Sequence, residues 1–212
     1  MLNSLLAFAA FAAIVTITPG LDTMLVIRTA AISGRRAAFA ASFGIMIGCL
    51  CWAVASALGI TALLTASRLG YEVLRSAGAA YLCFLGVRTL WRHRRPSTVD
   101  AGIPEPLKSG AGKAFRVGLT TNLVNPKVGV FYLAALPQFL PHGVPPLFAS
   151  VAMAMVHNVE GLVWFATLVF LVGRSARLLS RPGVRRRLDQ ITGLVFVGFG
   201  VRLATESAHR TT

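Results

Sequence analysis

An acidic and a basic residue follow helix-breaking residues inside two long apolar runs. Asp22 comes after Pro19 and Gly20 in the first run, and Lys127 comes after Pro126 in the second. A charge at the centre of a bilayer costs at least about 2.5–3.5 kcal/mol, so each of these charges needs a partner or water. Unwound backbone at that depth occurs only where it is buried in protein or lines a cavity. The pattern predicts that the two breaks meet around a polar site for a small solute.

Two interpretations of these residues are open from sequence alone. Asp22 and Lys127 form either a buried ion pair that locks the two halves together, or a pair that responds to substrate and protons. In the second case, protonation of Asp22 frees Lys127 to hold a carboxylate. The breaks at Pro19 and Pro126 either expose backbone groups that bind the ends of a solute or are packing kinks. Their corresponding places in two halves of the chain favour the functional interpretation.

Two carboxamides lie within one helical turn before Pro126. Asn122 and Asn125 offer donors and acceptors for an amino-acid-like solute, because each amide has both. The alternative, equally consistent with the sequence, is hydrogen bonding between helices.

A third polar group lies in an apolar segment that starts at Pro146 and contains His157, Asn158 and Glu160. His157 follows Pro146 by 11 residues, which is about 16 Å at a helical rise of 1.5 Å. That distance places the group near mid-membrane. Glu160 is a candidate proton relay, or it pairs with a buried donor such as Lys127 and only stabilises the bundle. The H-x-x-E spacing is too sparse for a metal site, so we expect no metal and no cofactor.

The composition indicates a membrane protein with one domain. The 212 residues are 55% hydrophobic and 13% charged, with a mean hydropathy of +0.69, whereas soluble domains carry about 25% charged residues. The net charge of +14 lies mostly between the apolar runs. This arrangement is typical of topology control and of attraction to anionic lipid, and it argues against nucleic-acid binding.

We therefore predict an all-α polytopic membrane protein with six transmembrane helices. The predicted spans are 2–31, 37–64, 72–91, 115–140, 146–172 and 188–205, with the first and fourth broken. Three spans per half is an odd number, so the halves would form two inverted repeats. The single transporter domain covers 1–212, with repeat A at 1–95, a cytoplasmic linker at 96–114 and repeat B at 115–212.

Charge asymmetry predicts the orientation. The loops after spans one, three and five hold most Lys and Arg, which places them in the cytoplasm and both termini outside. The N-terminal residues lack the positive region of a signal peptide, so we expect the first run to be a span. Gly44 and Gly48 form a G-x-x-x-G pattern that lets helices approach closely, either within the bundle or in a homodimer.

Several short motifs, in order along nearly the whole chain, resemble the lysine exporter family, in its branch of homoserine/threonine efflux proteins. They are TPG at 18–20, SGR at 33–35, LRSAGAAYL at 74–82, LGVR at 85–88, FRVG at 115–118, NPK at 125–127 and LPQF at 136–139. The resemblance implies a bacterial inner-membrane exporter of amino acids or related metabolites that works by proton antiport. Leu21 replaces the second proline of the family's P-G-P motif, and Asp22 stands where many relatives have a neutral polar residue. The resemblance does not choose among basic, neutral and modified amino acids.

Other classes of protein fit the sequence less well. A membrane-embedded redox or metal-handling protein of the same superfamily would need a C-x-x-C motif or a ligand cluster, and the sequence has neither. A structural subunit gains little from burying Asp22, Lys127 and Glu160. Phosphate-binding and nucleophile-elbow motifs are missing, so we do not expect an enzyme, and energy would come from an ion or solute gradient.

Overall fold

The computed structural model describes residues 2–91, 110–141, 143–172 and 182–208, and within them it contains helices and no strands. The prediction of an all-α chain is therefore confirmed for the described residues. The elements are α1 (Leu2–Ile17), α2 (Leu21–Ala66), α3 (Arg68–Trp91), α4 (Ala111–Leu123), α5 (Pro126–Val130), the π-helix η2 (Phe131–Ala135), the 3-10 helix η3 (Leu136–Phe139), α6 (Pro146–Phe170) and α8 (Pro182–Ala208).

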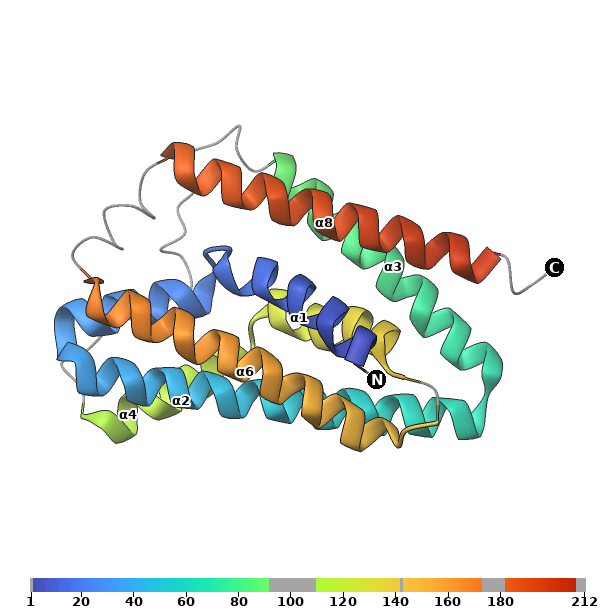
Figure 1. Ribbon diagram of the computed structural model, residues 1–212, viewed down its shortest axis with the longest axis horizontal. Coiled ribbons are helices and arrows are strands. Elements are labelled where there is room, and N and C mark those ends of the chain that lie inside the picture. The colour runs from blue at the N-terminus through green and yellow to red at the C-terminus, as the bar shows by residue number, and fades with distance from the viewer. Residues whose placement is uncertain (1, 92–109, 142, 173–181, 209–212) are drawn as a thin grey trace.

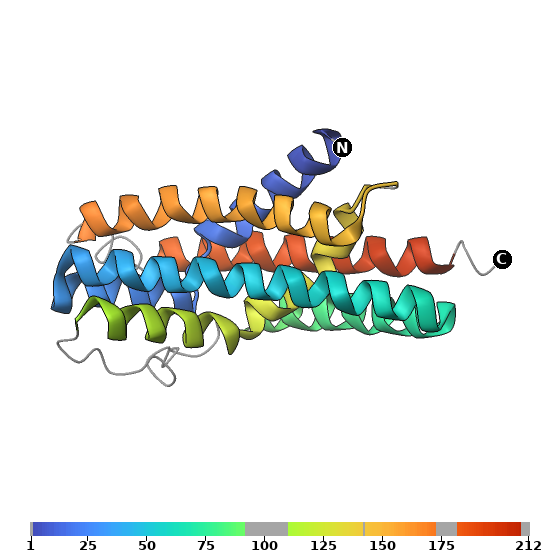
Figure 2. The same ribbon diagram turned by 90° about the horizontal axis from the view of Figure 1, so that it is seen from below.

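The long helices run along one axis, and α1 is tilted across them (Figure 2). The helix α2 packs against both α4 and α6, α1 packs against α6, and α3 packs against α8 (Figure 1). Two helical stretches, Leu21–Gly59 and Pro146–Phe170, are long and apolar enough to cross a membrane, and α1 is a shorter apolar helix. The full set of six spans and the inverted repeat stay predictions.

Both predicted helix breaks are present. The first separates α1, which ends at Ile17, from α2, which begins at Leu21. The second separates α4, which ends at Leu123, from α5, which begins at Pro126. Proline removes a backbone donor and clashes with the preceding turn, which explains why regular α-helix stops before each of these segments.

Some predicted boundaries were wrong. Between the first two predicted spans the structure has two helical stretches of α2 that meet at one non-helical residue, Gly34 (φ 82°, ψ 174°), rather than a loop of several residues. Only glycine adopts this backbone conformation readily, and the chain reverses direction there (Figure 1). After the second break the chain forms a short α-helix followed by π- and 3-10 turns rather than one regular half-helix. The helix α4 begins at Ala111, inside the segment predicted to be linker.

Many of the basic residues on which the predicted orientation rests lie outside the described part of the chain. They are Arg92, Arg94, Arg95, Lys108, Arg174, Arg177, Arg181 and Arg210. The predicted orientation therefore stays a prediction.

The G-x-x-x-G pattern of α2 lets another helix of the same bundle approach closely, which is one of the two predicted alternatives. A Cβ added at Gly44 would lie 2.1 Å from the carbonyl oxygen of Phe115 in α4. A Cβ added at Gly48 would lie 2.4 Å from Oδ1 of Asn122, in the same helix. The two backbones can therefore approach closely only because these positions lack a side chain.

An aromatic cluster joins α1 to the second half of the chain. Phe8 and Phe11 of α1 pack against Phe131 with ring centroids 5.6 and 5.8 Å apart, and Phe11 lies 4.9 Å from Phe199 of α8. Such ring pairs add to the energy of burial and have preferred geometries. The cluster fixes the position of α1 and of η2, which both contribute to the site described next.

Candidate functional site

The first break frees a backbone acceptor and places a carboxylate. Pro19 has no N–H, so the carbonyl of Val15, four residues earlier, cannot receive the usual helical hydrogen bond. The last bond of α1 runs from Thr18 N to Ile14 O at 3.3 Å, and the Thr18 hydroxyl pairs with that of Thr192 in α8. The new helix then carries Asp22 in its first turn, where the helix dipole favours a negative charge.

The second break is shaped by a capped helix start. Asn125 has extended backbone geometry, and its Oδ1 accepts a hydrogen bond from the backbone N–H of Lys127 at 3.1 Å. Pro126 occupies the first helical position, where a missing N–H costs nothing. Asn at the cap followed by Pro is a common way to begin a helix. Asn125 thus has a structural role as well as a place on the cavity wall.

The two breaks are joined by Asn122. Its Nδ2 donates to Oδ2 of Asp22 at 2.9 Å and lies 3.5 Å from Sγ of Cys49. The Asn122 side chain is fully buried and is not among those that line the cavity. Of the two interpretations of this residue, the structure favours hydrogen bonding between helices over direct contact with solute.

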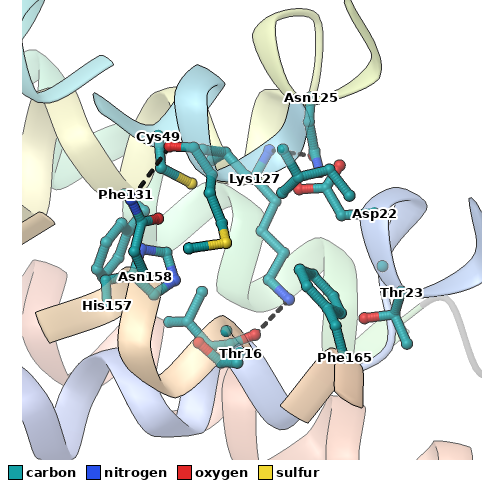
Figure 3. A pocket seen from close by; sticks show the side chains of 16 residues that line it. Thr16, Asp22, Thr23, Cys49, Asn125, Lys127, Phe131, His157, Asn158 and Phe165 are labelled. Carbon is teal, nitrogen blue, oxygen red and sulfur yellow. Dashed lines mark hydrogen bonds between the residues drawn. The ribbon is translucent and has the colours of Figure 1, made fainter. Parts of the chain in front are cut away.

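Lys127 reaches from α5 back to the end of α1. Its Nζ donates to the carbonyl oxygens of Val15 at 2.6 Å and Thr18 at 2.9 Å. Figure 3 shows the lysine ammonium pointing toward Thr16 and away from Asp22. The C-terminal carbonyls of a helix carry partial negative charge, so this is a favourable place for a cation. The two charged residues therefore lie around one site while holding different groups.

The side chains enclose a cavity of about 50 Å³. Its polar wall contains Thr16, Asp22, Thr23, Asn125, Lys127, His157 and Asn158, and its apolar wall includes Val15, Ile45, Phe131 and Phe165 (Figure 3). Gly20 and Cys49 also line it. Pockets for small molecules usually measure about 300–1,000 Å³. In this conformation the side chains fill most of the site.

The helix α6 supplies the remaining polar groups. His157 Nδ1 lies 2.9 Å from the hydroxyl of Tyr132, and Asn158 Nδ2 donates to the carbonyl of Met46 at 3.2 Å. Glu160 is half-buried, is not among the cavity-lining residues, and its Oε2 has no hydrogen bond within the described part of the chain. A role for Glu160 as a relay or as a partner of Lys127 therefore stays a prediction.

Sequence reasoning missed several residues at the site, among them Tyr132, Thr16 and Cys49. Tyr132 is fully buried in η2, where the π-helical turn directs it to His157. Thr16 and Cys49 line the cavity. Tyr132 had a weak signal, since it is a polar aromatic residue close to Pro126. The other two are common in apolar helices and gave none.

A second pocket lies on another side of the second break and is larger, at about 430 Å³. Its walls include Trp52, Tyr81, Pro126 and Leu133, and no charged side chain lines it. Asn125 lines both pockets. The smaller cavity is therefore the candidate for a charged solute. Within the described residues, no group of three or more His, Cys, Asp and Glu side chains could hold a metal ion.

Known proteins match this chain over nearly its full length. A threonine efflux protein of Escherichia coli (strain K12) is 27% identical over 96% of this chain and 98% of its own. An uncharacterized membrane protein of Pseudomonas aeruginosa is 32% identical over 90% of each chain, and one of Bacillus subtilis is 27% identical over 95% and 98%. No solved structure matches. The family model described as LysE type translocator matches residues 13–207, and the chain therefore belongs to the LysE-type translocator family.

Proposed function

We propose that this protein exports amino acids or closely related metabolites across the bacterial inner membrane by proton antiport. Membership of a translocator family and the similarity to threonine efflux proteins support an amino acid efflux transporter. A neutral hydroxy amino acid is the first solute to test, because it is the one that named relatives export. In this proposal six spans form two inverted repeats, with both termini outside.

One observation carries the proposal. Two helix breaks far apart in sequence meet around one cavity whose wall holds one carboxylate and one ammonium, those of Asp22 and Lys127. Broken helices that present backbone groups and charges at mid-membrane are the usual construction of a transporter's substrate site. An inert bundle gains little from holding a buried carboxylate and a half-buried ammonium on separate groups.

The wall residues suggest how a zwitterion would be held. Lys127 can reach the solute carboxylate, while Asp22 is the group whose protonation would change the charge of the cavity. His157 and Asn158 face the same space from α6, and Gly20 leaves room beside the lysine, since a Cβ there would lie 3.6 Å from Nζ. Pro19 and Pro126 create the breaks, Asn122 and Asn125 support them, and Glu160 is the outlying candidate for a proton relay.

Efflux of labelled amino acids from preloaded cells tests this proposal. Cells with and without the protein are compared, and the measurement is repeated after the proton gradient is collapsed. Asp22→Asn and Lys127→Ala should each abolish efflux while folded protein remains in the membrane. Lys113→Ala is the matched control, because Lys113 is an exposed lysine on α4 that does not line the cavity.

Each outcome separates the alternatives. Selective, gradient-dependent efflux that is lost in both cavity variants supports an antiporter with this site. Efflux that survives collapse of the proton gradient would exclude proton antiport and would favour export driven by the solute's own gradient. Normal efflux in both cavity variants would refute the site. A lack of efflux across the whole panel, with folded protein in the membrane, would favour export of metabolites other than amino acids first, and a structural subunit second.

A further inference from the structure

We propose that the Lys127 ammonium occupies the subsite meant for the amino group of the exported solute. In this view the Lys127 side chain fills the subsite when no solute is bound, and solute enters by displacing it. The subsite consists of the carbonyl oxygens of Val15 and Thr18 at the end of α1. This inference rests on the proposed function, because it identifies which solute group binds and where.

The subsite presents two backbone carbonyl acceptors that lack helical donors, and such acceptors suit an ammonium group. Pro19 deprives the Val15 carbonyl of its helical donor, and the end of α1 leaves the Thr18 carbonyl outside the helical ladder. Val15 and Thr18 are 4% and 5% exposed, so these oxygens are sheltered from bulk solvent. A primary ammonium has three donors, and two of them are already used here by the lysine. The α-ammonium of an amino acid offers the same three donors.

A further polar group lines the same cavity. The Thr16 hydroxyl is buried, accepts and donates no hydrogen bond in the described part of the chain, and lines the cavity. Figure 3 shows Thr16 on the side of the cavity toward which the Lys127 ammonium points. A solute ammonium bound between the carbonyls would therefore find a further polar group within the same wall.

The size of the cavity requires that something leave when solute enters. Its volume of about 50 Å³ is well below that of ordinary ligand pockets. Four methylene groups of Lys127 cross the space, and a Cβ at Gly20 would already touch its Cδ and Nζ at 3.6 Å. Withdrawal of this one side chain would free both the volume and the two carbonyls at once.

Asp22 provides the place to which the lysine can withdraw. It lines the same cavity, is 9% exposed, and its Oδ1 accepts no hydrogen bond from the described residues. Oδ2 is already held by Asn122. When a solute ammonium takes the carbonyls, Lys127 can move to Oδ1 or to the solute carboxylate. One cation then replaces another, so no charge is left without a counterpart in the low-dielectric interior.

Lysine NMR tests the displacement directly, because the sequence contains only three lysines. In a Lys108→Arg/Lys113→Arg background, Lys127 is the only lysine, and its ¹⁵Nζ signal reports its surroundings in purified full-length protein. L-threonine and methylammonium should both shift this signal and speed hydrogen exchange at Nζ. The matched control is 2,3-dihydroxybutyrate, which has a hydroxyl in place of the amino group of threonine. It should leave hydrogen exchange at Nζ unchanged, because it brings no ammonium to displace Lys127 from the two carbonyls. An unchanged Nζ signal at saturating threonine and methylammonium overturns the inference.

A second variant tests the vacated subsite. Lys127→Met keeps a long side chain without the charge, and it should bind methylammonium about tenfold more tightly than wild type by calorimetry, because the competing ammonium is gone. Tetramethylammonium, which has no N–H donor, should bind neither protein. Equal affinity of both proteins for methylammonium contradicts the inference, and the lysine NMR remains decisive if this variant does not fold. Efflux without any response of Lys127 would refute only this inference, whereas a response without efflux would refute only the proposed function.

Discussion

The hydrogen bond between Asn122 and Asp22 is the contact whose loss the structure predicts most clearly. Asn122→Leu removes the only hydrogen-bond donor that the described residues give to Oδ2, at 2.9 Å, and Oδ1 already lacks one. The buried carboxylate would then lose its hydrogen bond to Asn122 and keep only its interaction with the Asn125 side chain. The variant should be less stable than wild type. Leucine has the branching of asparagine but a larger volume, so the coupling energy of a double-mutant cycle, and not the single substitution, isolates the hydrogen bond.

The expected magnitude follows from the charge on the acceptor. A hydrogen bond to a charged group contributes about 1.5–3 kcal/mol, against about 0.5–1.5 kcal/mol for a neutral pair. Interhelical hydrogen bonds in membrane bundles average about 0.6 kcal/mol in double-mutant cycles. We therefore expect Asn122→Leu to lower the free energy of unfolding by about 1.5–3 kcal/mol in wild type, but by about 0.6 kcal/mol in an Asp22→Asn background. The coupling energy is then about 1 kcal/mol or more.

Reversible unfolding in mixed micelles, followed by circular dichroism, measures all four proteins of this cycle. Tryptophan fluorescence is unsuitable, because Trp52 Nε1 lies 3.4 Å from the Asn122 carbonyl and would respond to the substitution itself. Asn158→Leu is the matched control, since its buried amide donates to a neutral carbonyl at 3.2 Å and should cost about 0.6 kcal/mol. A coupling energy below about 0.3 kcal/mol, which is within the usual additivity of independent sites, would refute the reasoning.

Three further substitutions test the local geometry. Gly34→Ala should destabilise the protein by about 1–3 kcal/mol, because its φ is +82°. Gly59→Ala, exposed within the same helix and with open space around an added Cβ, should be neutral or slightly stabilising, and equal melting shifts for the two would contradict this. Gly118→Ala, whose Cβ would lie 2.1 Å from a carbonyl oxygen of α2, should lower the yield of monodisperse protein in size-exclusion chromatography. Gly112→Ala in the same helix should leave the yield unchanged, since nothing lies within 4 Å of that position. Asn125→Ala should cost about 1 kcal/mol in thermal unfolding through loss of the helix cap, whereas Asn125→Ser should retain most of the stability, and similar losses would argue against capping.

The sequence was informative where a residue type is incompatible with an ordinary apolar helix. Pro19, Pro126 and the two charges that follow them predicted both breaks and their meeting, because proline chemistry and the cost of a buried charge act locally. The group on α6 was found for the same reason, since His157 and Asn158 do line the cavity.

The details that sequence could not give depend on packing over long distances. A lysine side chain has several rotatable bonds, so nothing in the sequence determines that Lys127 turns toward the end of α1 rather than toward Asp22. The exact neighbour of Asn122 depends on how closely α2 and α4 approach, which Gly48 permits. Tyr132 reaches His157 because of a π-helical turn, and no simple residue pattern predicts that turn. The reversal at Gly34 was expected as a loop, because a single non-helical residue leaves almost no mark in composition.

The hydrogen bonds around the site join the first half of the chain to the second, and this limits how the protein can move. Lys127 holds α1 from α5, Asn122 holds α2 from α4, and the Ser56 hydroxyl donates to the carbonyl of Tyr132 at 2.8 Å. Any motion of one half against the other must break some of these bonds, and a buried polar group that loses its partner costs about 1–3 kcal/mol. A solute that takes over the carbonyls of Val15 and Thr18 satisfies the groups that Lys127 releases, so the motion becomes less costly with solute than without it. Binding and movement would then be coupled through the same few atoms, which is what an exporter requires if its empty cavity is not to leak.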